Sequence, residues 1–482
     1  MVEEKKDASL QTSGITKLKE RVTKLPKITL WTTVGAVALM VGTGIGIGIS
    51  SAIFSKTEQT ATIKLVKLEQ LPPEGEKLPV MMVTDGGTVD DKTFNEQAYL
   101  AFSRIDNSNS EDAINEALYG VDSERFYIQP SSDEPADLIN AYRTAITTLG
   151  RDTVTNVSGN TSSTNKKVLV VTGNKHKDAI FTFKQENPDD DTKFLFLDDG
   201  VDNFGHFPDD QPLTGFRNTY WIKFYMGTVA FQAGYLSALY LEAIGDTTPT
   251  LGAWAAQYRP NETIDIFLGF IAGVRYYNEN KAADKPEVTF VRFSDASKYT
   301  DAGFERGEVG RSNTNHMIDG GADIIFPIAG KQIEDAIDEI KKSDRANEIK
   351  VIGMSNNLSK EYQDDKEMLL TSVKKNVRKA TIEGYKALTG LSNNLGEAEE
   401  TEILTHSPTT KLFMLGQEKG FVNYVEQYSA STKVGDTEVT WGDLYKKVRS
   451  VPVSFMRTAK VSNTITLDNP DAQAIIFYME GR

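Results

Sequence analysis

The sequence predicts an α/β protein built from parallel sheets with crossover helices, preceded by one N-terminal membrane helix. Short apolar strand-like runs alternate with helix-compatible stretches, a 27-residue segment near the start carries no charge, and none of the 482 residues is cysteine. Alternation of strand and helix is typical of parallel sheets, because a crossover helix returns the chain to the same edge of the sheet. The lack of cysteine excludes disulfides, thiolate metal sites and cysteine nucleophiles.

The predicted strands are short, apolar runs of the kind that parallel sheets bury on both faces. Helical spacing is clearest at residues 333–340, where apolar residues recur at i, i+3, i+4 and i+7. A second helix, predicted at residues 224–241, is nearly apolar throughout. Its small residues indicate close packing inside the protein, and the bounding charges of Lys223 and Glu242, with several polar residues, argue against a second membrane span. The six predicted strands are residues 80–84, 168–172, 194–197, 288–293, 323–328 and 350–354, and residues 106–122, 156–165 and 199–210 are predicted surface insertions.

Residues 28–54 form the uncharged segment, which is long enough to cross a bilayer as a helix or to act as an uncleaved signal anchor. Residues 1–27 carry seven Lys/Arg against four acidic residues, and the positive-inside rule places them in the cytoplasm. Residues 55–77 have the composition of an extended tether. We therefore expect a single-pass protein of the cell membrane with an extracellular C-terminal body.

The charge balance and the missing motifs narrow the function. Lys and Arg number 53 and Asp and Glu 68, and the net charge of −15 argues against nucleic acid as a partner. The four histidines show no metal spacing, and neither a GxSxG nor a P-loop pattern occurs. We predict no enzyme activity, no metal and no cofactor. His176 is expected in a solvated loop, and Asp198 and Asp199 are expected to face water.

Residues 78–96 are the most informative stretch, because an apolar run there ends in an acidic, glycine-bearing turn followed by an aromatic residue and an amide. In open α/β sheets small ligands bind just beyond the carboxyl ends of the strands. The turn therefore predicts a ligand-binding edge, and an ordinary capped loop is the alternative. The residues at this edge would be Asp85, Asp90, Asp91, Phe94 and Asn95.

Five segments in collinear order resemble the basic membrane protein family, the purine-nucleoside-receptor-like solute-binding proteins of bacterial ABC importers. The similarity runs from about residue 78 to about residue 422. The segments are DGG with DKTFN at residues 85–87 and 91–95, FQAGYL at 231–236, GFIAGV at 269–274, GADIIFPIAG at 321–330 and LTSVKKN at 370–376.

The resemblance implies a type I periplasmic-binding-protein-like fold, with two doubly wound parallel-sheet lobes that are hinged by three crossing strands and close on a nucleoside. Lobe 1 would comprise residues 78–215 plus about 374–415, and lobe 2 residues 216–373 plus about 416–427. Residues 428–482 do not follow the family pattern and would form a C-terminal extension. The implied function is a membrane-anchored extracellular protein that captures a nucleoside-like small molecule for ABC permease subunits.

A purine is flat, with apolar faces and a polar edge, so its site needs aromatic rings for stacking and polar groups at the rim. By resemblance, Phe94 and Phe304 would stack on opposite faces of the base. Asp91 and Asn95 would bind the base edge, and Lys375 would reach the sugar hydroxyls. Phe304 as a core residue, and Lys374 as an exposed neighbour, are the simpler alternatives. The full predicted set is Asp85, Asp91, Phe94, Asn95, Phe304, Gly330, Ser355 and Lys375.

Two departures from the family pattern put the ligand in question. Ser355 stands where the family has an acid for the ribose diol, and one hydroxyl cannot accept two protons as a carboxylate can. Asn356 and Asn357 are the candidates to compensate. Trp254 and residues 255–256 replace a glycine pair, which predicts a changed cavity wall. A surface scaffold or adhesion and assembly protein with reduced or lost ligand binding is therefore the alternative function.

Overall fold

The structure is a computed structural model, and the part of the chain that it describes belongs to one compact unit, Glu74–Arg482. The predicted cytoplasmic segment, membrane helix and tether, residues 1–77, lie outside the described residues, as do residues 106–122 and 199–210 and the predicted site residue Asp91. Among the helices that are described, none combines the length and the apolar character that crossing a membrane requires. The described residues are 78–89, 94–101, 127–150, 152–155, 161–164, 166–173, 175–198, 216–259, 262–397, 409–427, 431–434 and 436–457.

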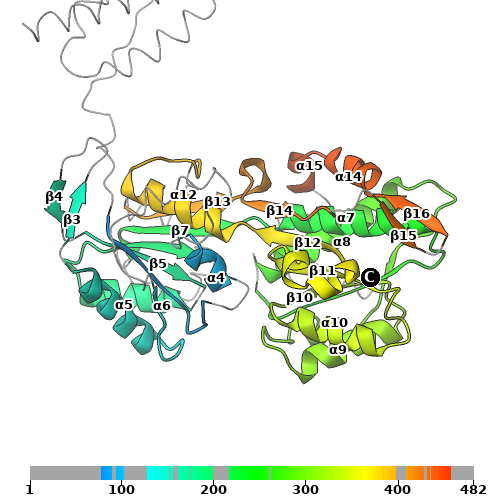
Figure 1. Cartoon of the computed structure of the whole chain (residues 1–482), viewed down its shortest axis with the longest axis horizontal. Coiled ribbons are helices and arrows are strands. Elements are labelled where there is room, and N and C mark those ends of the chain that lie inside the picture. Colours follow the sequence, from blue (N-terminus) through cyan, green and yellow to red (C-terminus); the bar gives the residue numbers. More distant parts are fainter. Residues whose placement is uncertain are drawn as a thin grey trace, which may run out of the picture. The chain divides into compact units, whose positions relative to one another are not determined.

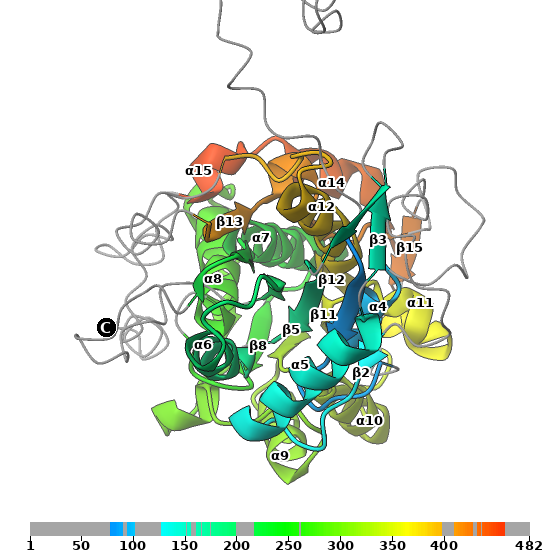
Figure 2. The same ribbon diagram turned by 90° about the vertical axis from the view of Figure 1, so that its left-hand side faces the viewer.

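The first lobe is built on a six-stranded parallel sheet with the order β13-β7-β6-β5-β1-β2. Helices α5 and α6 pack together on one face, and α4 and α12 pack together on the other (Figures 1 and 2). The strands are β1 (Val80–Val83), β2 (Tyr127–Ile128), β5 (Val168–Thr172), β6 (Lys193–Leu197), β7 (Thr219–Phe224) and β13 (Lys411–Leu415). The helices are α4 (Phe94–Tyr99), α5 (Pro135–Leu149), α6 (His176–Glu186) and α12 (Val377–Thr389), and a separate hairpin joins β3 (Asp152–Thr155) to β4 (Thr161–Thr164).

Alternation along β1 explains the two covered faces. Met81 and Val83 pack with the α5 and α6 side chains, whereas Val80 and Met82 belong to the cluster that includes α4 and α12. Successive strand residues point to opposite faces, so an apolar run without polar interruptions is what a doubly covered strand needs. The continuous apolar pattern predicted at residues 80–84 is therefore confirmed as a central strand.

The second lobe repeats this plan around a sheet with the order β14-β12-β11-β10-β8-β9, in which only the edge strand β14 is antiparallel. Helices α7 and α8 cover one face, and α9 and α10 cover the other (Figure 1). The strands are β8 (Thr250–Ala255), β9 (Thr289–Phe290), β10 (Ile324–Ile328), β11 (Lys350–Ser355), β12 (Leu369–Lys375) and β14 (Val422–Tyr424). The helices are α7 (Gly227–Ile244), α8 (Thr263–Asn280), α9 (Glu308–Asp319), α10 (Gln332–Lys342) and α11 (Leu358–Glu361), with the short 3-10 helices η4 (Ala296–Tyr299), η5 (Gln363–Met368) and η6 (Gln417–Lys419).

The chain crosses between the lobes three times: from β7 to α7, from β12 to α12, and from β13 to β14. Because β7 pairs with β6 and β13, the first crossing follows Phe224 and does not fall at the predicted residue 216. The same strand explains why the helix predicted from residue 224 begins only at Gly227. The predicted strand at residues 288–293 is reduced to the two residues of β9.

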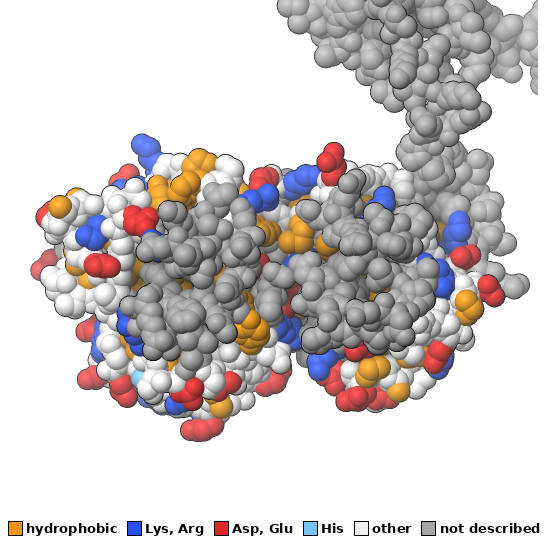
Figure 3. Space-filling model, turned by 180° about the vertical axis from the view of Figure 1, so that it is seen from behind, with side chains coloured by type: hydrophobic (Ala, Val, Ile, Leu, Met, Phe, Trp, Pro, Cys, Tyr) orange, Lys and Arg blue, Asp and Glu red, His pale blue; other side chains and the backbone are white. Residues whose placement is uncertain are grey.

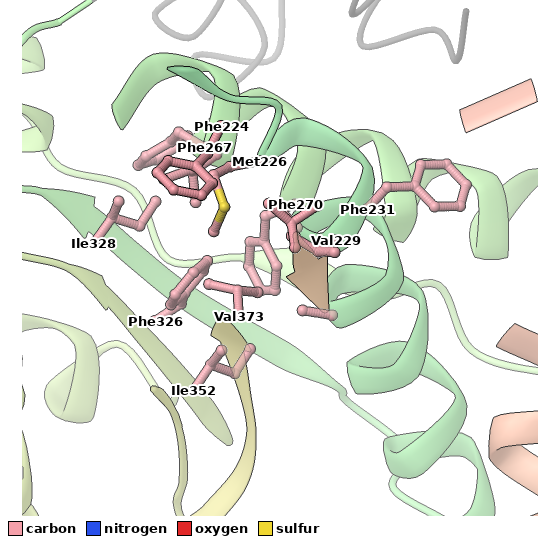
Figure 4. Close-up of a cluster of buried hydrophobic side chains, with 14 of the residues drawn as sticks. Phe224, Met226, Val229, Phe231, Phe267, Phe270, Phe326, Ile328, Ile352 and Val373 are labelled. Atoms are coloured by element: carbon pink, nitrogen blue, oxygen red, sulfur yellow. The ribbon is translucent and has the colours of Figure 1, made fainter. Parts of the chain in front are cut away.

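Glycines bring α7 and α8 into close contact. A Cβ on Gly234 would overlap the carbonyl oxygen of Phe270, and one on Gly273 would overlap that of Phe231. Phe270 of α8 also contacts Phe326 of β10 in the sheet that these helices cover, with ring centroids 5.1 Å apart (Figure 4). Both family-like segments, residues 231–236 and 269–274, thus belong to this helix interface, which confirms the predicted close packing.

The residues after the third crossing pack onto the second lobe. They form the hairpin β15 (Ser431–Val434) and β16 (Thr437–Thr440), followed by α14 (Trp441–Arg449) and α15 (Val453–Arg457). The Trp441 ring stacks on Tyr240 of α7 with centroids 5.5 Å apart, and Phe455 meets Tyr276 of α8. The described part of the predicted C-terminal extension is therefore continuous with the core of this lobe.

His176 is buried, which contradicts its prediction as a solvated loop residue. Its Nδ1 lies 2.7 Å from the Tyr142 hydroxyl, and the two rings stack. Burial lowers the pKa of His176 to about 3, so the ring is neutral in the folded protein. On the face of the molecule shown in Figure 3, acidic and basic side chains of the described residues are interspersed.

Candidate ligand-binding site

The site begins where neighbouring strands of the first lobe end. Asp85 follows β1, and its Oδ1 accepts hydrogen bonds from Asn95 Nδ2 at 3.0 Å and from the Gly87 amide at 3.2 Å. Thr172, at the end of β5, donates to Asn95 Oδ1 at 2.5 Å. The predicted residues Asp85 and Asn95 therefore lie together, but Asn95 is buried and its side chain ties α4 to the strand ends.

The two glycines of the turn are required by close packing. Gly86 adopts φ +97°, a region that L side chains rarely adopt. A Cβ on Gly87 would lie 2.7 Å from Asn95 Nδ2 and 3.1 Å from Asp85 Oδ1. The turn thus closes tightly around the Asp85 carboxylate and places Phe94 at the start of α4.

Lys375 ends β12 and joins the two lobes. Its Nζ donates to Asp198 Oδ1 at 2.8 Å and Oδ2 at 2.7 Å, and Asp198 follows β6 of the first lobe. Nζ also lies 5.9 Å from the centroid of the half-buried Phe94 ring. The side chain of Lys375 is 3% exposed, whereas Lys374 is only partly buried, so Lys375 is the lysine that points inward.

A row of alternating charges continues from Lys375 into the second lobe. Glu262 Oε1 lies 4.0 Å from Lys375 Nζ, and Glu262 Oε2 accepts a hydrogen bond from Arg259 Nη1 at 2.9 Å. The Arg259 guanidinium in turn lies 5.1 Å from the centroid of the Phe304 ring. A row of four charged residues thus lies between the two aromatic rings that were predicted to bind the base, in the order Asp198, Lys375, Glu262 and Arg259. Each ring has a cation beside it.

Phe304 and Gly330 meet at the carboxyl end of β10. Phe304 is 37% exposed, which is inconsistent with a simple core role. Its carbonyl accepts from the Lys331 amide at 3.2 Å, and a Cβ on Gly330 would lie 3.2 Å from the same oxygen. Gly330 has φ +42°, so glycine allows the loop to approach this closely.

The loop that carries Phe304 is held in place by hydrogen bonds from Gln332. Its Nε2 donates to the carbonyls of Ala302, Gly303 and Glu305, and its Oε1 accepts from Trp254 Nε1 at 3.3 Å. Trp254, Ala255 and Ala256 are all buried. The large indole lies in the core and supports the loop from inside, and the predicted change of cavity wall stays a prediction.

Ser355 ends β11 beside Lys374 and adopts φ +70°, which is unusual for a residue other than glycine. Its side chain is partly exposed, whereas Asn356 next to it is buried. Burial lowers the pKa of Lys374. The strand end expected to carry the diol-binding acid thus presents one short hydroxyl.

Three residues of this arrangement escaped the sequence analysis: Asp198, Glu262 and Arg259. Asp198 was expected to face water, but its side chain is 14% exposed and paired with Lys375. Its position directly after a predicted strand was the signal that could have identified it, because ligands and ion pairs gather at strand carboxyl ends. Glu262 and Arg259 lie near the start of α8 and carry no pattern of their own.

The chain forms two lobes with parallel sheets, joined by three crossings, and both lobes carry polar and aromatic groups at their strand ends. This architecture is that of the two-lobed class of solute-binding proteins. The chain belongs to the PnrA-like family of ABC transporter substrate-binding proteins, whose model matches residues 78–400. The family predicted from the five segments is thereby confirmed.

Relatives and solved structures show more distant similarity. CD4+ T-cell-stimulating antigens of Listeria monocytogenes and Listeria innocua are each 26% identical over 279 residues, which is 57% of this chain and 62% of the relative. The match thus spans less than two thirds of these relatives. A solute-binding protein of an ABC transporter system from Aeropyrum pernix K1 is 16% identical, with 84% of this chain and 86% of that chain covered and a TM-score of 0.47. A sugar-binding protein from Bacillus halodurans is 14% identical, with 72% and 97% covered and a TM-score of 0.44.

Proposed function

We propose that this protein is a membrane-anchored extracellular receptor that captures a nucleoside or a related small molecule and delivers it to the permease subunits of an ABC importer. One observation carries the proposal: each lobe presents an aromatic ring at its strand ends, and the row of charged residues runs between them. A planar base needs apolar faces and a polar rim, which this combination of groups supplies.

Capture would proceed by closure of the lobes on the ligand. Phe94 belongs to the first lobe and Phe304 to the second, so a base stacked on both rings bridges the lobes. A ligand that contacts both lobes binds the closed state more tightly than the open one and shifts the equilibrium toward closure. Residues 28–54 would anchor the body to the membrane, with residues 1–27 in the cytoplasm.

The test is ligand-induced stabilisation of the full-length protein by adenosine, guanosine, inosine and uridine. A ligand that binds only the folded state raises the free energy of unfolding by about 2.7 kcal/mol at a concentration of 100 Kd. We expect a concentration-dependent rise in Tm with at least one nucleoside. Accessibility of residues 78–457 to protease on intact cells tests the orientation independently.

A scaffold or adhesion role is the second candidate, and two observations favour it. Ser355 replaces the expected acid, and Arg259 already lies against one face of Phe304. A scaffold would show the same Tm with and without every nucleoside, whereas a receptor would not.

A further inference from the structure

We propose that Glu262 is the ligand-binding carboxylate that accepts the two hydroxyls of the ligand's sugar, and that the ligand therefore carries a vicinal diol. The inference rests on the proposed function and assigns a role to a residue on which the family resemblance is silent. Glu262 would supply the hydrogen-bond acceptor that is missing at Ser355, where one hydroxyl group cannot replace the two oxygens of a carboxylate.

The other carboxylates near the two rings are already engaged. Both oxygens of Asp198 accept hydrogen bonds from Lys375, at 2.8 and 2.7 Å. Asp85 Oδ1 is bound to Asn95 and to the amide of Gly87, inside a turn that closes around it. Both acids thus hold strand ends in place through these bonds, and a ligand hydroxyl would have to share an oxygen that is already bound.

Glu262 differs from them in geometry. Arg259 holds Oε2 at 2.9 Å, which fixes the orientation of the carboxylate. Oε1 points toward Lys375 Nζ at 4.0 Å, a distance beyond a hydrogen bond. Within the described part of the chain, no hydrogen bond to Oε1 is formed, and the side chain is 23% exposed. One oxygen of this partly exposed side chain is thus oriented and available as an acceptor.

Lys375 completes the arrangement. An ammonium group has three N–H donors, and two of those of Lys375 are directed to Asp198. A ligand hydroxyl near Glu262 Oε1 and Lys375 Nζ can donate to the carboxylate and accept from the third N–H. Its neighbouring hydroxyl can donate to the same carboxylate, so this pair of groups suits a diol better than a single hydroxyl or a free base.

The position also agrees with the two rings. Lys375 lies 5.9 Å from the Phe94 ring, and Arg259, which holds Glu262, lies 5.1 Å from the Phe304 ring. Glu262 therefore lies along the row of charges between the two predicted stacking residues. A nucleoside whose base contacts these rings would bring its sugar toward this row.

The experiment uses whichever of adenosine, guanosine, inosine and uridine binds the full-length protein most tightly, together with its 2′,3′-dideoxy form. Calorimetry should show that the natural protein binds the ribonucleoside at least ten-fold more tightly than the dideoxy form. In Glu262→Gln this preference should fall to about two-fold or less, because affinity for the ribonucleoside drops while affinity for the dideoxy form stays the same. Glu262→Ala should behave in the same way.

Glu279→Gln is the matched control, because Glu279 pairs with Arg275 at 2.7 Å near the end of α8, whereas Glu262 directly precedes the start of that helix. It should keep the full preference. Equal binding of both ligands by the natural protein, or an unchanged preference in both Glu262 variants, overturns the assignment of Glu262 and leaves the proposed receptor function intact. Failure of the natural protein to bind any of the four nucleosides overturns the proposed function and this inference with it.

Discussion

Lys375 Nζ lies 2.7 Å from Asp198 Oδ2, and this ion pair links the last residue of β12 in the second lobe to the residue after β6 in the first. The lysine side chain is 3% exposed and that of the aspartate 14%. A buried ion pair of this kind contributes little net stability, but loss of one partner leaves the other charge buried and unpaired. The pair therefore fixes where the two lobes meet at the site.

The first prediction concerns this pair. Lys375→Met should lower the free energy of unfolding by about 3 kcal/mol, because the Asp198 carboxylate loses the cation that donates to both of its oxygens. In Lys375→Met with Asp198→Asn the loss should be smaller than the sum of the two single losses by about 1 to 3 kcal/mol. Urea denaturation of the four proteins measures this coupling. Strict additivity would show that the two side chains do not interact in solution.

The second prediction concerns Phe94. Phe94→Ala should weaken nucleoside binding at least ten-fold, on the order of the 1 to 3 kcal/mol that stacking of a base on an aromatic ring contributes. Phe455→Ala removes a more exposed ring from α15, which lies outside the candidate site, and should leave affinity unchanged. Calorimetry measures the nucleoside affinity of both variants. An affinity of Phe94→Ala equal to that of the natural protein would show that this ring does not belong to the site.

The third prediction concerns the contact between α7 and α8. Gly273→Ala should lower the free energy of unfolding by about 1 to 3 kcal/mol, because the added Cβ overlaps the Phe231 carbonyl. Gly442→Ala in α14 is the control, since a Cβ there meets open space and alanine favours the helix. A Gly273→Ala protein as stable as the control would contradict the close helix contact.

The fourth prediction concerns His176 and pH. Burial lowers its pKa from 6.5 to about 3, so between these values the unfolded chain binds a proton that the folded protein does not. The contribution to stability is complete above pH 6.5 and is lost as the pH falls toward 3, by up to about 1.4 kcal/mol per pH unit. In His176→Phe this part of the slope should vanish. Urea denaturation at pH 7, 6, 5 and 4 compares the two slopes, and identical slopes would mean that His176 titrates normally.

Several of the strands that are buried on both faces could be predicted from the sequence. Residues 168–172 and 324–328 read as continuous apolar runs, and both are central strands. β7 was missed because Lys223 and Thr219 interrupt its apolar pattern, although both are buried. β9 has only two residues because its apolar run continues as irregular backbone after Phe290.

The site was predicted only in part, because sequence shows which residue follows a strand but not what its side chain meets. Gly86 and Gly87 could be recognised, since a tight turn after a strand demands them. Asn95 was expected to meet ligand, yet it binds Asp85 and Thr172. No sequence pattern marked Glu262 as a site residue, because its proposed role depends on Lys375, which is more than a hundred positions away in the chain.

Direct titration of the full-length protein with adenosine, guanosine, inosine and uridine in a calorimeter tests the central claim most directly. We predict saturable binding of at least one nucleoside with one site per chain, together with a rise in Tm. No binding of any of the four, and no nucleoside detected by mass spectrometry in the protein as purified from its cells, would contradict the assignment of this protein as a nucleoside receptor.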